Sequence, residues 1–301
     1  MMATETKSKI LVLLDGSDHA FEAVRYLNWL EPFRNRQVVL FSVLTKIPEA
    51  YWDIEKQPKY EQSMKNIHAW QTTREMKLTK YMDEARRQLL DSGFPENAVE
   101  VKIQERRTGI GRDILEEARK GGYSAVVVGR KGAGRVRGLV LGSVTTKLLE
   151  RLDFVPIFVV GRCPATHKIL VALDGSDSSV RAVDYVCETL EGCDCDVTLV
   201  HVVRSEREDF VERAEKKIAP VFELAKSHLA NWGFNPRRIK TRLITGAVSR
   251  AGSIVREAEE GNYCTIVVGR RGLSEPGIYF MGRVSNKIVQ LAKKQVVWVV
   301  T

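Results

Sequence analysis

Residues 9–18 read KILVLLDGSD, and residues 168–177 read KILVALDGSD, the same sequence at nine of ten positions. Each stretch is a short apolar run followed by Asp-Gly, which is typical of a buried strand that ends in a turn. A second pair, YSAVVVGRKG at 123–132 and YCTIVVGRRG at 263–272, repeats later in each copy. The two pairs predict that the chain contains two copies of one folding unit.

The copies divide the 301 residues near the middle. The segment 161–167 contains Pro164 and lies between them, so we expect domains at 1–161 and 162–301. The first copy is longer, and most of its surplus lies at 45–76. This insertion is rich in aromatic residues, and we expect it to cover part of its own domain.

Strand and helix patterns alternate within each copy. The apolar runs are short, continuous and rich in Val and Ile, as in parallel strands buried on both faces, and segments such as 20–29 and 81–90 have helical spacing. The expected strands are 9–14, 37–43, 98–105, 124–129 and 155–160, then 168–173, 196–203, 238–244, 264–269 and 296–300. This alternation predicts an α/β fold of two tandem, doubly wound, Rossmann-like parallel sheets of five strands each. Their ligand sites would lie beyond the carboxyl ends of the strands, where the strand order reverses.

Composition narrows the class of protein. The net charge of +9 is spread over both halves without a basic arm, which disfavours nucleic acid as a partner. No apolar run approaches the ~20 residues that cross a bilayer, and the first residues lack the apolar core of a signal peptide, so we expect a cytoplasmic protein without a membrane partner. The five cysteines are expected to be free thiols, and Cys193 and Cys195 lack the spacing of a zinc site.

The loop after the fourth strand, 129–143, reads GRKGAGRVRGLVLGS. Its glycines Gly129, Gly132 and Gly142 are expected to adopt positive φ and to let backbone N–H groups approach an anion. Ser143 is placed to cap a helix whose N-terminus attracts phosphate. Further positive charge would come from Arg130, Lys131, Arg135 and Arg137. The alternative is an ordinary tight connection with a capping serine and solvated arginines.

Neither a P-loop nor a complete dinucleotide fingerprint occurs. The spacing G-x2-G-x9-G-S, together with Asp15 at the end of the first strand, closely resembles the nucleotide-binding pattern of the universal stress protein family. The resemblance spans essentially the whole chain, taken as two tandem copies. It implies ATP-binding domains of strand order 3-2-1-4-5 that pair through their fifth strands, here within one chain and related by a pseudo-two-fold axis.

The resemblance also implies a site for ATP with Mg²⁺ in the first copy. Asp15 would contact the ribose or lie under the adenine, and the backbone of Val43 would meet the adenine. Val128 and Gly129 would line the base and ribose. The phosphates, with Mg²⁺ bridging their oxygens, would be held by Gly132, Gly142, Ser143 and Val144. The alternative role for Asp15 is to cap the first helix.

The second copy departs from this pattern. Its loop, 269–283, reads GRRGLSEPGIYFMGR, so the glycines are kept while Arg283 replaces the hydroxyl residue. Arg283 could contact phosphate through its donors or fill the space that phosphates need. The corresponding weaker site would comprise Asp174, Val202, Gly269, Gly272 and Gly282. We expect this copy to bind nucleotide weakly or to serve as the pseudo-symmetric partner.

No residue is placed by sequence as a base for ATP hydrolysis. His19 is expected to be solvated in the first turn of a helix, and His201 to be a packed strand residue. Taken with the absence of such a base, the resemblance implies an ATP-binding regulatory or protective module of the stress response and not an enzyme. A slow Mg-dependent ATPase using the same site and a nucleotide-free interaction protein remain as alternatives. A protein partner and a homodimer stay open.

Overall fold

The computed structural model describes residues 8–46, 61–131, 141–273 and 281–301. Ten strands form one mixed sheet of order β3-β2-β1-β4-β5-β10-β9-β6-β7-β8. The strands are β1 (Lys9–Leu13), β2 (Gln37–Leu44), β3 (Val99–Glu105), β4 (Tyr123–Gly129), β5 (Ile157–Val160), β6 (Lys168–Ala172), β7 (Asp196–Val202), β8 (Ile239–Ile244), β9 (Thr265–Gly269) and β10 (Val296–Val300). Each half of the sheet is parallel and has the order 3-2-1-4-5, which confirms the predicted fold class.

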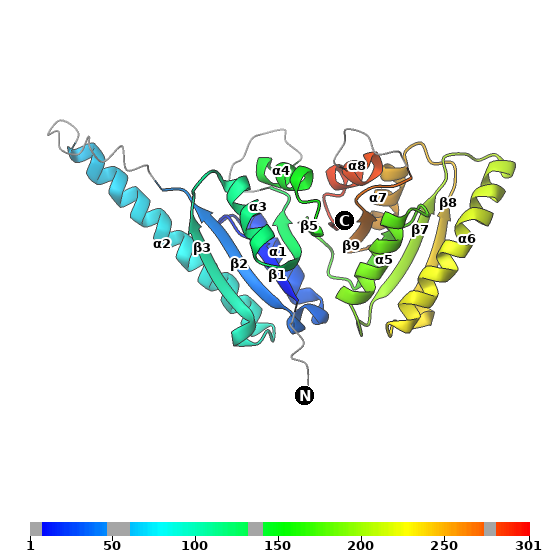
Figure 1. The fold of residues 1–301 in the computed structure, drawn as a ribbon, viewed down its shortest axis with the longest axis horizontal. Coiled ribbons are helices and arrows are strands. Elements are labelled where there is room, and N and C mark those ends of the chain that lie inside the picture. The colour runs from blue at the N-terminus through cyan, green and yellow to red at the C-terminus, as the bar shows by residue number, and fades with distance from the viewer. Residues whose placement is uncertain (1–7, 47–60, 132–140, 274–280) are drawn as a thin grey trace.

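Helices cover both faces of the sheet (Figure 1). They are α1 (Asp18–Trp29), α2 (Glu61–Asp91), α3 (Ile110–Lys120), α4 (Ser143–Arg151), α5 (Asp177–Thr189), α6 (Glu208–Asn231), α7 (Arg250–Glu260) and α8 (Arg283–Leu291), with short 3-10 helices η1 (Glu31–Asn35), η4 (Glu96–Ala98) and η5 (Pro236–Arg238). On one face α1, α2, α5 and α6 pack against alternate strand residues, and α3, α4, α7 and α8 pack against the others. Because the central strands are buried on both faces, they read as unbroken apolar runs.

The two halves join through the antiparallel pairing of β5 with β10, as predicted. Phe158 of β5 stacks on Trp298 of β10 with ring centroids 4.2 Å apart. The indole N–H of Trp298 donates to the hydroxyl of Tyr26, which lies 2.9 Å from the hydroxyl of Thr265. One continuous apolar layer therefore crosses the junction, and the polar atoms of Tyr26, Thr265 and Trp298 within it are hydrogen-bonded.

The insertion at 45–76 was predicted to cover part of its own domain, and this stays a prediction. Residues 61–76 belong to α2, and 47–60 lie outside the described residues. The N-terminal part of α2 projects beyond the edge strand β3 (Figure 1), and the side chain of Trp70 is 55% exposed. A helix of 31 residues is longer than the sheet it packs on, so its first turns pass the sheet edge.

The cysteine prediction is wrong for one pair. Cys193 and Cys195 form a disulfide in the turn between α5 and β7, where their Cα atoms are 5.2 Å apart. Cys163, Cys187 and Cys264 are free, as expected. Within the described ranges, no helix is both long and apolar enough to cross a lipid bilayer.

Candidate functional site

A cavity of about 500 Å³ opens at the carboxyl edge of the first half of the sheet. We call it the first cavity. It lies where the strand order reverses between β1 and β4, the place at which doubly wound sheets bind ligands. The ends of β1, β2 and β4, the starts of α3 and α4, and α2 contribute its walls. Its lining includes Asp15, Val43, Arg74, Lys77, Ile110, Ile114, Val128, Gly129, Lys131, Gly142, Ser143, Val144 and Thr145.

Seven of the eight residues predicted for the first site line this one cavity. They are Asp15, Val43, Val128, Gly129, Gly142, Ser143 and Val144. The eighth, Gly132, lies outside the described residues, as do Arg135 and Arg137. Residues more than 100 positions apart in the chain are thus brought to one pocket, although their role in binding stays a prediction.

The turn after β1 holds Asp15 at the mouth of the cavity. One Asp15 oxygen accepts from the N–H of Ser17 at 3.1 Å and from its hydroxyl at 2.6 Å, and Gly16 has a φ of +80°. Ser17 itself caps α1 by accepting from the N–H of Ala20, so the alternative that Asp15 is the cap is wrong. Asp15 is thereby left facing the cavity.

Tyr81 of α2 fixes this turn from the other side. Its hydroxyl donates to the carbonyl of Ser17 at 2.8 Å. Burial raises the pKa of Tyr81 well above its ordinary value, and the negative charges of Asp15 and Asp18 add to the shift. The phenol therefore stays a proton donor at every physiological pH and ties α2 to the start of α1.

The two loop glycines that the structure describes do not adopt positive φ. Gly142 has a φ of −69°, and Gly129 is not among the residues with positive φ. A Cβ on Gly129 would instead lie 3.1 Å from the carbonyl oxygen of His19, so this glycine permits a close approach of β4 to α1. His19 is exposed in the first turn of α1, as expected.

Ser143 does not cap α4, contrary to expectation. Gly142 is the N-cap residue and Ser143 is the first residue of the helix, with no side-chain cap bond in this described segment. The helix is anchored by Thr145, whose hydroxyl donates to the carbonyl of Gly129 at 2.9 Å. The N-terminus of α4 thus points its backbone donors at the cavity, and the Ser143 side chain stands beside them.

Sequence reasoning missed the contribution of α2. Arg74 and Lys77 line the first cavity together with Lys131, while Asp15 supplies a carboxylate. Three cations against one anion favour an anionic ligand. The missed signal was the helical spacing of Arg74 and Lys77, which places both on one face of a helix.

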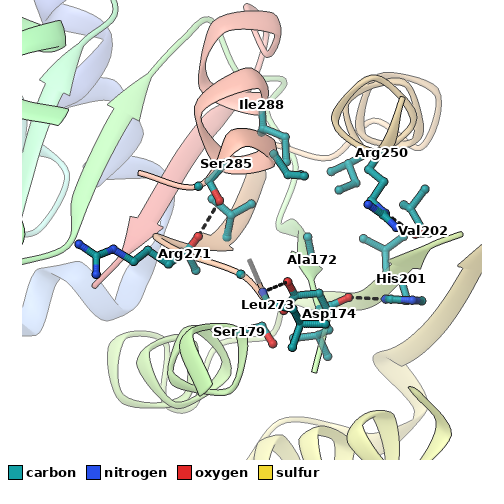
Figure 2. A pocket seen from close by; sticks show the side chains of 18 of the residues that line it. Ala172, Asp174, Ser179, His201, Val202, Arg250, Arg271, Leu273, Ser285 and Ile288 are labelled. Carbon is teal, nitrogen blue, oxygen red and sulfur yellow. Dashed lines mark hydrogen bonds between the residues drawn. The ribbon is translucent and has the colours of Figure 1, made fainter. Parts of the chain in front are cut away.

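A second cavity of about 260 Å³ occupies the matching place in the second half. All five residues predicted there line it, namely Asp174, Val202, Gly269, Gly272 and Gly282. So do His201, Arg250, Arg271, Leu273, Arg283 and Ser285. Figure 2 shows this cavity, with Arg250 directed at Val202 and the side chain of Arg271 directed away from Asp174.

The second cavity keeps the backbone plan and uses its polar groups internally. Asp174 accepts from Ser176, as Asp15 does from Ser17, and its other oxygen accepts from the N–H of Leu273 at 3.3 Å (Figure 2). Arg250 Nε donates to the carbonyl of Val202 at 3.4 Å. Asp174 and the carbonyl of Val202 are thus engaged by the protein itself.

His201 is only half-buried. Its Nδ1 donates to the carbonyl of Leu173 at 2.7 Å, and its ring lines the second cavity. The prediction that His201 is a packed strand residue is therefore only partly correct, because its ring also borders a cavity. In the described ranges, no group of three or more His, Cys, Asp or Glu side chains is arranged to hold a metal ion.

The sequence predicts that Arg130 adds positive charge to the glycine loop, and this is wrong. Arg130 is 8% exposed and its guanidinium donates to the carbonyls of Val289 and Ala292 at 2.6 and 2.8 Å, at the end of α8. Burial lowers the pKa of Arg130 to about 10, so the side chain remains charged at neutral pH. Arg130 thereby provides donors for carbonyls at the end of α8, where helix carbonyls have no partner within the helix.

The comparisons with known proteins agree with this geometry. The model of the universal stress protein family matches residues 7–160 and 165–300. A universal stress protein of Mycolicibacterium smegmatis is 22% identical over 224 residues, which cover 70% of this chain and 72% of the relative. Universal stress protein YxiE of Bacillus subtilis is 27% identical over 143 residues, 42% of this chain and 93% of the relative.

One solved structure matches both halves together. The crystal structure of a universal stress protein from Archaeoglobus fulgidus superposes with a TM-score of 0.67 over 98% of this chain and 99% of that chain, at 18% identity. At this identity the match concerns the fold, and the two family matches cover nearly the whole sequence. This chain belongs to the universal stress protein family, in its tandem two-domain form.

Proposed function

We propose that the protein binds ATP with Mg²⁺ in the first cavity and acts as a stress-response regulatory or protective module. The observation that carries the proposal is the convergence of seven predicted residues on one cavity that also holds three cations. A volume of about 500 Å³ lies within the range of sites that bind small ligands and cofactors.

The lining of the first cavity fits the parts of a nucleotide. Val43, Val128 and Ile114 offer apolar surface for a base, and Asp15 offers an acceptor for ribose hydroxyls. The N-terminus of α4 with Ser143 offers donors for phosphates. Mg²⁺ prefers oxygen ligands and commonly keeps phosphate oxygens and water around it, so it would enter with the nucleotide.

We propose that the second cavity binds nucleotide more weakly. The carbonyl of Val202 already accepts from Arg250 there, and a ligand would have to break that bond before gaining its own. Arg250 and Arg283 still give this cavity a positive character.

One structural feature favours regulation. Helix α2 contributes Arg74 and Lys77 to the cavity, and the guanidinium carbon of the same Arg74 lies 5.4 Å from the ring centroid of Trp70, an exposed side chain. Nucleotide that engaged Arg74 would therefore alter the surroundings of an exposed aromatic group. A partner protein could distinguish the two states at this surface.

The first test is to denature the purified protein and to quantify released nucleotide per chain by anion-exchange chromatography. We expect about one ATP per chain in the wild type and a large loss in Ser143→Ala, because a hydroxyl that contacts phosphate is removed. Thr79→Ala deletes an exposed hydroxyl of α2 outside the cavity and is the matched control. Absence of nucleotide, with no binding on addition of Mg-ATP, would refute the proposal and favour the nucleotide-free interaction protein.

Steady phosphate release by the wild type would favour the ATPase alternative. If release occurred, it should disappear in Gly132→Val and Ser143→Ala, and its rate should lie below the ordinary enzyme range of ~1 s⁻¹.

A further inference from the structure

Two buried arginines cross between the halves in opposite directions. Arg130 directly follows β4 and bonds the carbonyls at the end of α8, while Arg270 directly follows β9 and bonds the carbonyls of Leu149 and Leu152 at the end of α4. Arg130 also donates to the carbonyl of Gln290 at 3.0 Å. Each half therefore caps a helix of the other with a multidentate guanidinium.

The backbones of the same two arginines belong to the cavity loops. The N–H of Gly142 donates to the carbonyl of Arg130 at 2.8 Å, and the N–H of Gly282 donates to the carbonyl of Arg270 at the same distance. Gly142 and Gly282 are the N-cap residues of α4 and α8. Each arginine thus holds the start of one helix with its backbone and the end of the other helix with its side chain.

The starts of α4 and α8 are walls of the two cavities. Ser143 and Val144 line the first cavity, and Arg283 and Val284 line the second. Figure 1 shows the two helices on either side of the centre of the molecule. These contacts link the two cavities in a closed cycle. The start of α4 is held by Arg130, whose side chain holds the end of α8, and the start of α8 is held by Arg270, whose side chain holds the end of α4.

These contacts are costly to give up. Arg130 and Arg270 are 8% and 4% exposed, and a guanidinium that lost its acceptors there would be a buried charge without partners. Burial also lowers the pKa of Arg270. A rigid helix of nine residues whose end is held in this way can shift only together with the arginine that holds it.

We infer that Arg130 and Arg270 are positioning residues that act across the junction, each holding the helix that forms the anion-binding wall of the cavity in the opposite half. Arg270 would set the affinity of the first cavity for nucleotide without lining it. Ligand that orders α4 would also favour the Arg270 contacts and so the arrangement of the second cavity, which makes the coupling between the cavities positive. The affinity part of this inference rests on the proposed ATP site.

The test uses the full chain with Arg270→Met, which keeps the volume and removes the donors, and Arg270→Lys, which keeps the charge without the fork. Arg151→Met is the matched control, because Arg151 is an exposed cation in the last turn of the same helix α4. Mg-ATP affinity is measured by titration calorimetry, and hydrogen exchange of the amides of 143–148 is measured without ligand.

We expect Arg270→Met to weaken Mg-ATP binding about tenfold and to speed exchange at the start of α4. Arg270→Lys should lie between it and the wild type, and Arg151→Met should stay within about twofold of the wild type. Wild-type affinity and wild-type exchange in Arg270→Met would overturn the inference. If Arg270→Met failed to fold, Arg270→Lys would decide by the same two measurements.

Failure of the proposed ATP site is recognised separately. If the wild type bound no Mg-ATP, the proposed function would be refuted, while the exchange measurement would still decide whether Arg270 positions α4. The reciprocal variant Arg130→Met should speed exchange at 283–288 in α8 and leave the exchange of β7 unchanged.

Discussion

The two cavities share a backbone plan and differ in volume and in the side chains that line them. Both follow an Asp-Gly-Ser turn, and both lie against a helix that begins after a loop glycine. In the second cavity Arg250, which stands where the first has Ile110, donates to the carbonyl of Val202, and the volume is about half as large, 260 against 500 Å³. A repeated fold therefore preserves the position of a site more faithfully than its chemistry.

The largest expected difference concerns the glycines that end β4 and β9. A Cβ on Gly269 would lie 2.5 Å from the carbonyl oxygen of Ser178, whereas one on Gly129 would lie 3.1 Å from that of His19. We expect Gly269→Ala to lower the free energy of unfolding by about 3 kcal/mol and Gly129→Ala by about 1 kcal/mol. Urea denaturation measures the free energy of unfolding of the two variants. Equal decreases would show that α1 and α5 move away from the added methyl group equally easily.

Ile110 begins α3 and Arg250 begins α7, and exchanging these two residue types should change the affinity of the cavities for nucleotide. Ile110→Arg places a guanidinium where Arg250 engages the end of the neighbouring strand. We expect this change to weaken Mg-ATP binding in the first cavity by about tenfold or more, because a hydrogen bond to a charged donor must be broken. Calorimetric titration measures the change.

The reverse exchange, Arg250→Ile, should strengthen binding in the second cavity by freeing the carbonyl of Val202. Arg256→Ile removes an exposed arginine of the same helix α7 and is the control. Unchanged affinities in both exchanges would mean that the engaged carbonyl does not distinguish the cavities.

A smaller effect is expected from α2. Lys77→Ala removes one of the cations of the first cavity, and we expect Mg-ATP affinity to fall by about threefold at low salt and by less at high salt. Arg87→Ala, which removes an exposed arginine of the same helix, is the control. Identical affinities for wild type and Lys77→Ala at low salt would show that Lys77 does not contribute to binding.

The smallest predicted difference is one of acid stability. Asp113 of α3 is buried and matches Ser253 of α7 in position. Burial alone would raise the pKa of Asp113, but the N–H groups of Thr108 and Arg107 and the Thr108 hydroxyl outweigh it and hold the pKa below its ordinary value.

A lowered pKa in the folded state means that this carboxylate stabilises the fold above the unfolded pKa of about 3.9 and that the contribution is lost as the pH falls further. Asp113→Asn should therefore lower the thermal midpoint at pH 6 and should differ less from the wild type at pH 3. A constant difference between wild type and variant across this range would contradict the assignment.

The fold was predictable because its signals are local and repeated. Apolar runs such as those of β1 and β6 recur with helical segments between them, and these alternations permit few arrangements. The candidate site was predictable where it depends on strand ends, as for Asp15 and Val128, since parallel strands of one sheet end at the same edge.

What sequence reasoning missed depends on side-chain direction over long distances. Arg130 stands next to Gly129 in the chain but turns away from the loop into the junction. Asp174 and Leu273 are joined by a bond between loops 99 positions apart, and the Cys193–Cys195 disulfide depends on the shape of a turn. No periodicity encodes such contacts, because each depends on the packed structure that surrounds it.

The pairing of β5 with β10 within one chain also bears on how substitutions are inherited. In a symmetric pair of identical chains, any replacement appears at both sites at once, so an arginine in place of the loop serine would be imposed on each. Here one polypeptide carries both halves, and Arg283 stands in one copy while Ser143 remains in the other. The single chain thereby fixes a one-to-one ratio of two unlike cavities, and the residues of each can change independently.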